Sequence, residues 1–240
     1  MKIAKHTLPL IFLFVALTAC NKSIFGSIKG KGPNVTEIRS ITGFNKIRLD
    51  IDADITYIQD SNYFVEISAQ ENVLNVLTTK VSAGELNVEF SKWVRRHSNI
   101  SIVIHSPEIK GLNISGSGNI TANGPINTNY MDLHISGSGN INLGTLNSDE
   151  LEASISGSGN IQVNGGTANN QRATISGSGS MDMLGLSATN SNAKISGSGS
   201  ITVKVIQQLD ATISGSGNIR YAGTPIVNTH ISGSGSVIHL

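Results

Sequence analysis

Hydrophobic and polar residues alternate through much of the first half of this chain. Between residues 35 and 110, apolar side chains recur at every second position, as in Ile47-Arg48-Leu49-Asp50-Ile51 and Leu86-Asn87-Val88-Glu89-Phe90. Successive side chains of a strand point to opposite faces of a sheet, so a period of two is typical of strands with one buried face. Residues 70–79 would form a helical turn at most. The pattern predicts an all-β region.

The second half of the chain repeats one phrase, Ile-Ser-Gly-Ser-Gly, followed by Asn or Ser and then by Ile, Met or Val. Successive copies are 18 to 21 residues apart, and the seven copies begin at Ile114, Ile135, Ile155, Ile175, Ile195, Ile213 and Ile231. A fixed period indicates stacked units, each of which buries its apolar face only against its neighbours. The repeats therefore predict one continuous core along a stack.

Apolar and polar positions keep one parity within every copy. The inward set of the second copy is Leu133, Ile135, Gly137, Gly139, Ile141 and Leu143. The intervening Ser and Asn side chains face solvent, because neighbouring residues of a strand point opposite ways. Glycine accepts positive φ and close approach of two backbones, so Ser-Gly-Ser-Gly is predicted to be a corner between two short strands.

One repeat then forms one coil of a parallel β-helix, and seven coils spaced about 4.8 Å apart make a rod of roughly 34 Å. The alternative is a series of antiparallel hairpins, whose turns usually contain Asn-Gly or Asp-Gly. The same residues recur at the same coil position, which direct stacking explains more simply. We expect an all-β fold in which a parallel β-helix-like rod of about seven short coils follows an irregular β region.

The first residues have the organisation of a bacterial export signal. Lys2 and Lys5 precede an apolar run at residues 8–17, which is too short to cross a bilayer comfortably. The run leads into Leu17-Thr18-Ala19-Cys20, which looks like a lipobox whose cysteine is lipidated and becomes the mature N-terminus. The alternative is an ordinary secretory signal with a chance cysteine. The lipobox predicts a membrane anchor at Cys20 and a place in the bacterial cell envelope, as an outer-membrane lipoprotein facing the periplasm or the surface.

Composition divides the chain into four parts. These are a lipoprotein signal peptide at 1–19, a polar, Gly-rich tether at 20–33, an N-terminal β region at 34–110 and a repeat β-helix region at 111–240.

Charge and cysteine content exclude several classes of protein. The formal net charge is +1 and charged residues make up 14% of the chain, so no surface for nucleic acid is expected. Cys20 is the only cysteine, which excludes an intrachain disulfide and a cysteine metal site. His134 and His230 occupy equivalent coil positions, but at about 4.8 Å a coil they lie roughly 24 Å apart and cannot share a zinc ion. We expect no metal and no cofactor.

The repeats resemble a known family. Gly-Asn-Ile follows Ile-Ser-Gly-Ser at residues 118–120, 139–141, 159–161 and 217–219. These segments are similar to the family called putative auto-transporter adhesin, head GIN domain, and residues 41–47 look like its opening strand. The resemblance covers about residues 35–240. It implies a right-handed β-helix-like fold in an exported, often lipid-anchored protein, and it implies no catalytic residues.

Two groups of residues are candidates for binding. Residues 91–98 place the only tryptophan, Trp93, beside the cations Arg95 and Arg96, in a segment predicted to be a loop tip. Such a cluster can bind an anionic glycan or lipid headgroup, unless it is a solvated loop with Trp93 packed down. The second group is a ladder of outward amides at Asn119, Asn140 and Asn160. These amides would either bind a glycan or a protein edge, or simply satisfy one another.

An enzyme that processes polysaccharide is an alternative, since glycoside hydrolysis needs two carboxylates roughly 5–10 Å apart. Asp149, Glu150 and Glu152 cluster at one turn, where solvation alone explains them. The repeated serines lack a paired histidine. We expect no catalytic residues and a non-enzymatic, adhesin-like or structural role, with a glycan or an envelope or host protein as partner. A scaffold subunit of an envelope assembly is the remaining alternative.

Overall fold

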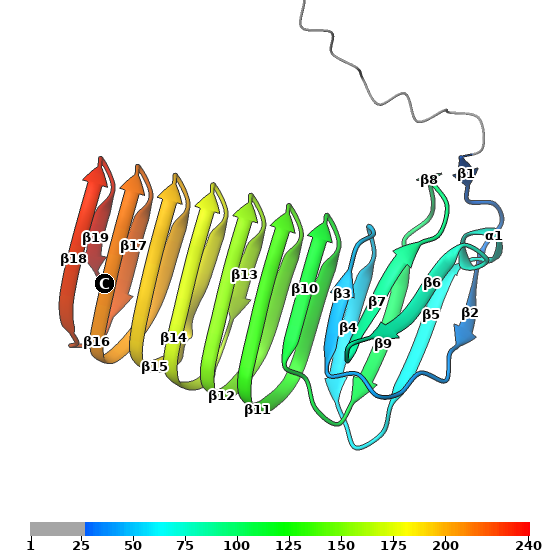
Figure 1. The fold of residues 1–240 in the computed structure, drawn as a ribbon, viewed down its shortest axis with the longest axis horizontal. Helices are drawn as coiled ribbons and strands as arrows, with labels where there is room; N and C mark the ends of the chain where they lie inside the picture. The colour runs from blue at the N-terminus through cyan, green and yellow to red at the C-terminus, as the bar shows by residue number, and fades with distance from the viewer. Residues whose placement is uncertain (1–26) are drawn as a thin grey trace, which may run out of the picture.

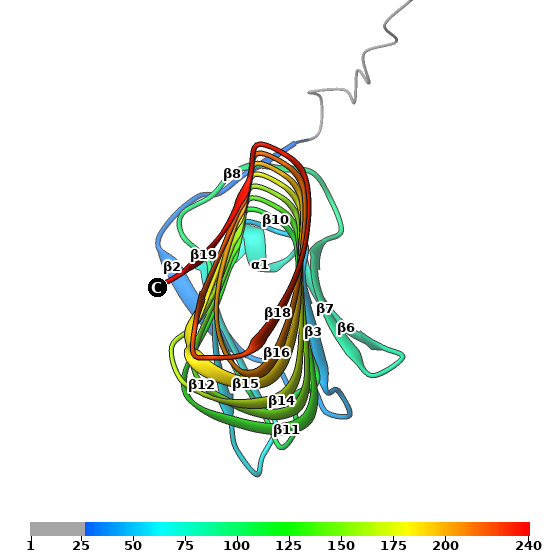
Figure 2. The ribbon, with the colours of Figure 1, turned by 90° about the vertical axis from the view of Figure 1, so that its left-hand side faces the viewer.

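The computed structural model describes residues 27–240, so the predicted signal peptide and Cys20 lie outside the described residues. The described chain forms a flattened rod in which strands stack along one axis (Figures 1 and 2). Its elements are β-strands apart from one short helix, α1 (Glu71–Leu74). The all-β prediction is confirmed.

The repeat region is a parallel β-solenoid of about 6 turns between residues 111 and 239. Each motif isoleucine pairs in register with its copy in the next coil, as Ile135 does with Ile114 and Ile155. Parallel pairing excludes the series of hairpins, whose strands would be antiparallel. The strands of this region are β10 (Gly111–Gly116), β11 (Asn119–Gly137), β12 (Asn140–Gly157), β13 (Asn160–Val163), β14 (Gly166–Gly177), β15 (Ser180–Gly197), β16 (Ser200–Gly215), β17 (Asn218–Ala222), β18 (Ile226–Gly233) and β19 (Ser236–His239).

The predicted inward positions form the core. Ile135 and Ile141 are fully buried, and the equivalent residues of the neighbouring coils stack above and below them. The long strands bend at the broad end of the coil, whereas the Ser-Gly-Ser-Gly segments form its narrow corner (Figure 2). A single coil could not bury these side chains, so the stack supplies the core.

Two glycines explain why the corner phrase recurs. Gly157 has φ +135°, and a Cβ atom there would overlap the carbonyl oxygen of Gly137 in the preceding coil. At Gly159 a Cβ would lie 2.5 Å from the Gly139 carbonyl oxygen and 2.7 Å from Cγ2 of Ile135. Close stacking of the corners therefore leaves no room for a side chain at either position.

Parallel stacking continues into the N-terminal region. Leu49 of β3 (Lys46–Leu49) pairs with Ile114, and Asp54 of β4 (Asp54–Gln59) pairs with Asn119. The next layer outward contains β7 (Glu85–Phe90) and β9 (Ser101–Ser106), which pair in parallel with β3 and β4. Parallel strand pairing therefore continues across the predicted boundary between the N-terminal β region and the repeat region at residue 110.

Antiparallel strands cover the N-terminal end of this stack. β2 (Asn34–Ile38) and β5 (Phe64–Gln70) extend from β9, β6 (Leu77–Ser82) extends from β7, and α1 buries Val73 and Leu74. This antiparallel arrangement replaces the parallel stacking of the coils at that end, and β2 and β6 are its outermost strands. A separate pair is formed by β1 (Ile28–Lys29) and β8 (Val94–Arg96). No helix within residues 27–240 is long and apolar enough to cross a membrane.

Candidate functional site

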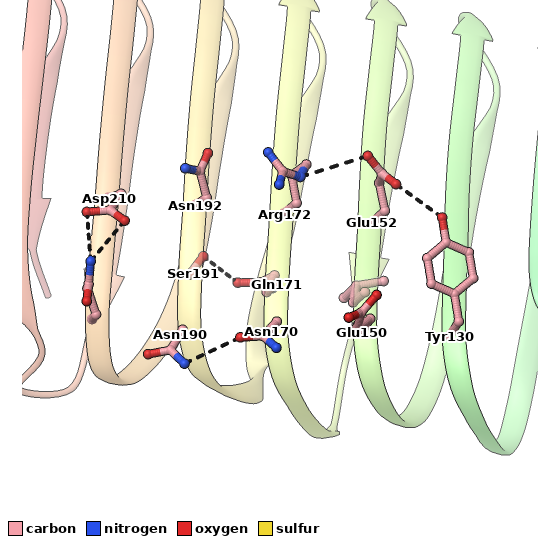
Figure 3. A pocket seen from close by; sticks show the side chains of 12 residues that line it. Tyr130, Glu150, Glu152, Asn170, Gln171, Arg172, Asn190, Ser191, Asn192 and Asp210 are labelled. Carbon is pink, nitrogen blue, oxygen red and sulfur yellow. Dashed lines mark hydrogen bonds and ion pairs between the residues drawn. The ribbon is translucent and has the colours of Figure 1, made fainter.

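A polar groove of about 480 Å³ crosses the coils β11 to β16 near their broad bends (Figure 3). Two rows of side chains line it, and both come from register across the coils. The first row contains Glu152, Arg172, Asn192 and Asp210. The second row contains Tyr130, Glu150, Asn170, Asn190 and Gln208.

The floor between the rows includes two buried polar side chains. Gln171 and Ser191 are each 3% exposed and occupy positions that are apolar in neighbouring coils, such as Leu151. Ser191 Oγ donates a hydrogen bond to Gln171 Oε1 at 2.8 Å, and Gln171 Nε2 donates to Met183 Sδ at 3.3 Å. Because these groups are paired with each other and with sulfur, the polar floor is stable without a ligand.

Tyr130 closes one end of the groove. Its hydroxyl donates a hydrogen bond to Glu152 Oε2 at 3.1 Å, and Arg172 Nε lies 3.9 Å from Glu152 Oε1. Burial, followed by the hydrogen bond to Glu152 and the charges of nearby acids, raises the pKa of Tyr130 to about 12. The phenol of Tyr130 is therefore protonated at neutral pH and continues to donate its hydrogen bond to the Glu152 carboxylate.

At the other end, Gln208 Nε2 donates to both oxygens of Asp210, at 3.2 and 3.0 Å. Asn190 Nδ2 donates to Asn170 Oδ1 at 3.4 Å. Three carboxylates and one guanidinium line the groove, so its formal charge is −2. The arrangement offers many donors and acceptors to an uncharged polar ligand and repels a polyanion.

The predicted amide ladder forms at the narrow corners. Asn119 donates to Asp54 Oδ1 at 2.7 Å, while Asn140 donates to Asn119 and Asn160 to Asn140, each at 2.8 Å. Each of these amides thus donates one N–H group to a neighbour, and Asn119 and Asn140 also accept a hydrogen bond through Oδ1. The ladder links each corner to the next and so stabilises the stack, which agrees with the interpretation that these amides satisfy one another.

Trp93, Arg95 and Arg96 come together at a tip beside the N-terminal segment. Trp93 is 67% exposed, so it does not pack down on the protein. The segment is partly a strand instead of an open loop, since β8 pairs with β1. Ile28 N donates to the Trp93 carbonyl and Gly30 N to the Arg96 carbonyl, both at 2.8 Å. Part of the predicted tether is thereby held against this tip.

The acidic turn is divided by the bend of the coil. Glu150 and Glu152 line the groove, whereas Asp149 lies on the other side and accepts a hydrogen bond from Asn169 at 2.9 Å. Within residues 27–240, no group of three or more His, Cys, Asp or Glu side chains is placed to hold a metal ion.

Sequence reasoning missed most of the groove, including Tyr130, Arg172 and Gln171. A signal for it was present in the repeat period. Counting one period from Glu152 reaches Arg172, the next reaches Asn192, and a period of 18 then reaches Asp210. Residues at equivalent coil positions lie side by side in a solenoid, so these unlike side chains had to form a row.

The structure is thus an all-β solenoid whose N-terminal end is covered by antiparallel strands and whose coils carry a polar groove. The chain belongs to the family described as putative auto-transporter adhesin, head GIN domain, whose model matches residues 43–225. The adhesin description of this family suggests a cell-surface or envelope protein.

Three solved structures are similar to it over nearly their whole length. A putative adhesin from Bacteroides fragilis is 25% identical with a TM-score of 0.83, covering 89% of this chain and 100% of its own. A putative adhesin from Parabacteroides merdae is 29% identical with a TM-score of 0.75, covering 90% and 99%. A putative lipid binding protein from Parabacteroides distasonis is 28% identical with a TM-score of 0.72, covering 89% and 99%. No curated protein matches the chain significantly in sequence. The family and these structures name no enzyme.

Proposed function

We propose that this protein is a lipid-anchored, adhesin-like protein of the bacterial envelope that binds a carbohydrate chain in its polar groove without cleaving it. The observation that carries the proposal is the pair of side-chain rows that line the groove, one across four coils and the other across five (Figure 3). The adhesin descriptions of the family and of two similar structures support a binding role.

The chemistry of the groove suits a carbohydrate. Its volume of about 480 Å³ falls within the range of roughly 300–1,000 Å³ that is usual for ligand sites. Coils spaced about 4.8 Å apart repeat the polar rows at close to the length of one sugar unit. A glycan lying along the rod would therefore meet a new pair of amide, carboxylate or guanidinium groups at each sugar.

The negative charge of the groove limits the kinds of glycan that it can bind. The formal charge of −2 in the groove disfavours uronic acids, sulfated sugars and phosphorylated sugars. Neutral or amine-bearing sugars avoid this repulsion. Arg172 lies between Glu152 and Asn192 in its row, where it can donate to ring or glycosidic oxygens.

Binding without cleavage is supported by the surroundings of the two carboxylates on β12. Glu150 and Glu152 are both exposed, and Glu152 is engaged by Tyr130 and Arg172. A general acid in glycoside hydrolysis is a carboxyl group with a raised pKa, and burial in an apolar pocket is one common cause of such a rise. The amide-lined groove provides no such pocket around either residue.

A glycan array probed with the mature protein tests the proposal. We expect binding to neutral or amine-bearing oligosaccharides. The double substitution Arg172→Ala, Asn192→Ala should weaken it about tenfold or more, since a lost charged hydrogen bond is worth about 1.5–3 kcal/mol and 1.4 kcal/mol is tenfold in Kd. Both residues are exposed, so the variant should fold normally.

The matched control is Asn140→Ala, Asn160→Ala on the amide ladder, which should change the affinity less than about twofold. An array on which no glycan binds, or a groove variant with unchanged affinity, would contradict the proposed function.

A further inference from the structure

Trp93 and its neighbouring cations project from the N-terminal end of the rod. Arg95 and Arg96 are exposed, as are Lys92 before them and Lys29 on the paired strand β1. We call these four cations together with Trp93 the basic tip. Exposed acids lie nearby, at Asp50 and Asp52 in the corner of the adjoining layer and at Glu71 on α1, which contacts β1.

The basic tip is held rigidly. Strand pairing places Ile28 beside Val94 and Lys29 beside Arg96. His97 packs edge-on against Phe90, with ring centroids 5.8 Å apart, and Ser98 N donates to Gln70 Oε1 at 2.9 Å. Trp93 is therefore exposed on an ordered segment, so its insertion into a lipid bilayer would cost little conformational entropy.

Chain length limits how far the basic tip can lie from Cys20. Only eight residues lead from Cys20 to Ile28, and eight extended residues span at most about 28 Å. A lipid on Cys20 would thus keep Ile28, and the basic tip bonded to it, within about 28 Å of the bilayer surface, so the basic tip can reach the headgroups. Figure 1 shows β1 and β8 together at one end of the rod, away from the coils that carry the groove.

The chemistry of the basic tip matches a membrane surface. Tryptophan prefers the interface between headgroups and hydrocarbon, where its ring is partly buried and its N–H group stays hydrated. Arginine and lysine side chains are attracted to anionic lipid headgroups within about a Debye length of the surface. An exposed tryptophan surrounded by cations has both properties at once.

We propose that the basic tip docks into the headgroup layer of an anionic bilayer and orients the rod, so that the groove points away from the membrane. The orientation rests on the lipid anchor of the proposed function. Headgroup binding by the basic tip does not depend on that anchor, because it can be measured on protein that carries no lipid.

The test uses the mature chain with Cys20→Ser and vesicles of phosphatidylcholine with or without phosphatidylglycerol. Trp93 is the only tryptophan, so tryptophan fluorescence, excited selectively over that of the four tyrosines, reports on the basic tip alone. We expect the emission to shift to shorter wavelength, and soluble quenchers to lose access, with phosphatidylglycerol vesicles at low salt. Raising the salt concentration should reverse both effects, because exposed charges are then screened.

Arg95→Glu, Arg96→Glu should reduce the vesicle-bound fraction about tenfold or more, as each cation contributes to surface attraction. The control Lys194→Glu, Lys204→Glu makes the same charge change at exposed positions on the repeat coils and should reduce it less than about twofold. Equal loss in both variants, or vesicle binding without a change in Trp93 emission, would overturn the proposal. Failure of the parent Cys20→Ser protein to bind anionic vesicles would overturn it as well. Any of these results would leave the glycan array unaffected, so the two proposals fail separately.

Discussion

Gly157→Val is expected to lower the free energy of unfolding by several kcal/mol. The residue has φ +135°, a conformation that costs a β-branched side chain about 1–3 kcal/mol. Its Cβ would also overlap the carbonyl oxygen of Gly137, and forced overlap in a packed structure adds about 1–3 kcal/mol. Coils lie on both sides of Gly157, so the backbone cannot move away without breaking a ladder.

Ser158→Ala is the matched control, because its side chain is exposed at the same corner. Its effect should stay within about 0.5 kcal/mol, as for most surface substitutions. Chemical denaturation followed by circular dichroism measures both variants. Similar shifts of the two midpoints would show that the corner does not have the stacked geometry described.

Cys20→Ser is expected to abolish labelling of the protein by a fatty-acid probe in growing cells. Cys20 is the only cysteine and ends the lipobox, so no other thiol can accept the lipid. Stable attachment of a protein through acyl chains takes two or more signals, and their loss leaves at most the weak attraction of the basic tip.

Release from the membrane is measured with the mature sequence carrying Cys20→Ser, exported by a cleavable secretory signal. This arrangement removes the apolar run at residues 8–17, which could itself hold an unprocessed chain at the membrane. The variant should fractionate with soluble protein after a high-salt wash. Persistent acyl labelling, or a membrane-bound fraction equal to that of the wild type after the wash, would count against the anchor.

The repeat coils could be predicted from sequence because each one carries the same local pattern. The alternation of apolar and polar residues predicted that Ile135 and Ile141 are buried. The recurrence of glycines such as Gly157 and Gly159 predicted the corner between two strands of each coil. These features depend on neighbours in the chain and on identical copies above and below. The prediction of parallel stacking followed from them and is confirmed by the register.

The same stack continues into residues that lack the phrase. Register aligns Asp54 and Ile55 with Asn119 and Ile120, so Ala53 takes the place of the second corner glycine at Gly118. Alternation alone could not distinguish this layer from an ordinary strand pair. The antiparallel cap was equally hidden, since pairing between β2 and β5 depends on contacts far apart in sequence.

The sequence alone predicted more of the basic tip than of the groove. Composition identified Trp93, Arg95 and Arg96, because a lone tryptophan among cations is conspicuous in a chain of low charge. Their pairing with Ile28 and Lys29 required tertiary structure. The groove was missed because Glu152, Arg172 and Asn192 are ordinary outward residues until register places them in one row.

The central claim is that the groove, and neither the amide ladder nor the basic tip, holds the ligand. A crystal structure of the protein with an oligosaccharide selected on the glycan array tests it most directly. We predict sugar density along the rod between the row of Glu152, Arg172 and Asn192 and the row of Glu150, Asn170 and Asn190, with an intact glycosidic chain. Density at Trp93 or along Asn119 and Asn140, or a cleaved chain in the groove, would contradict the account.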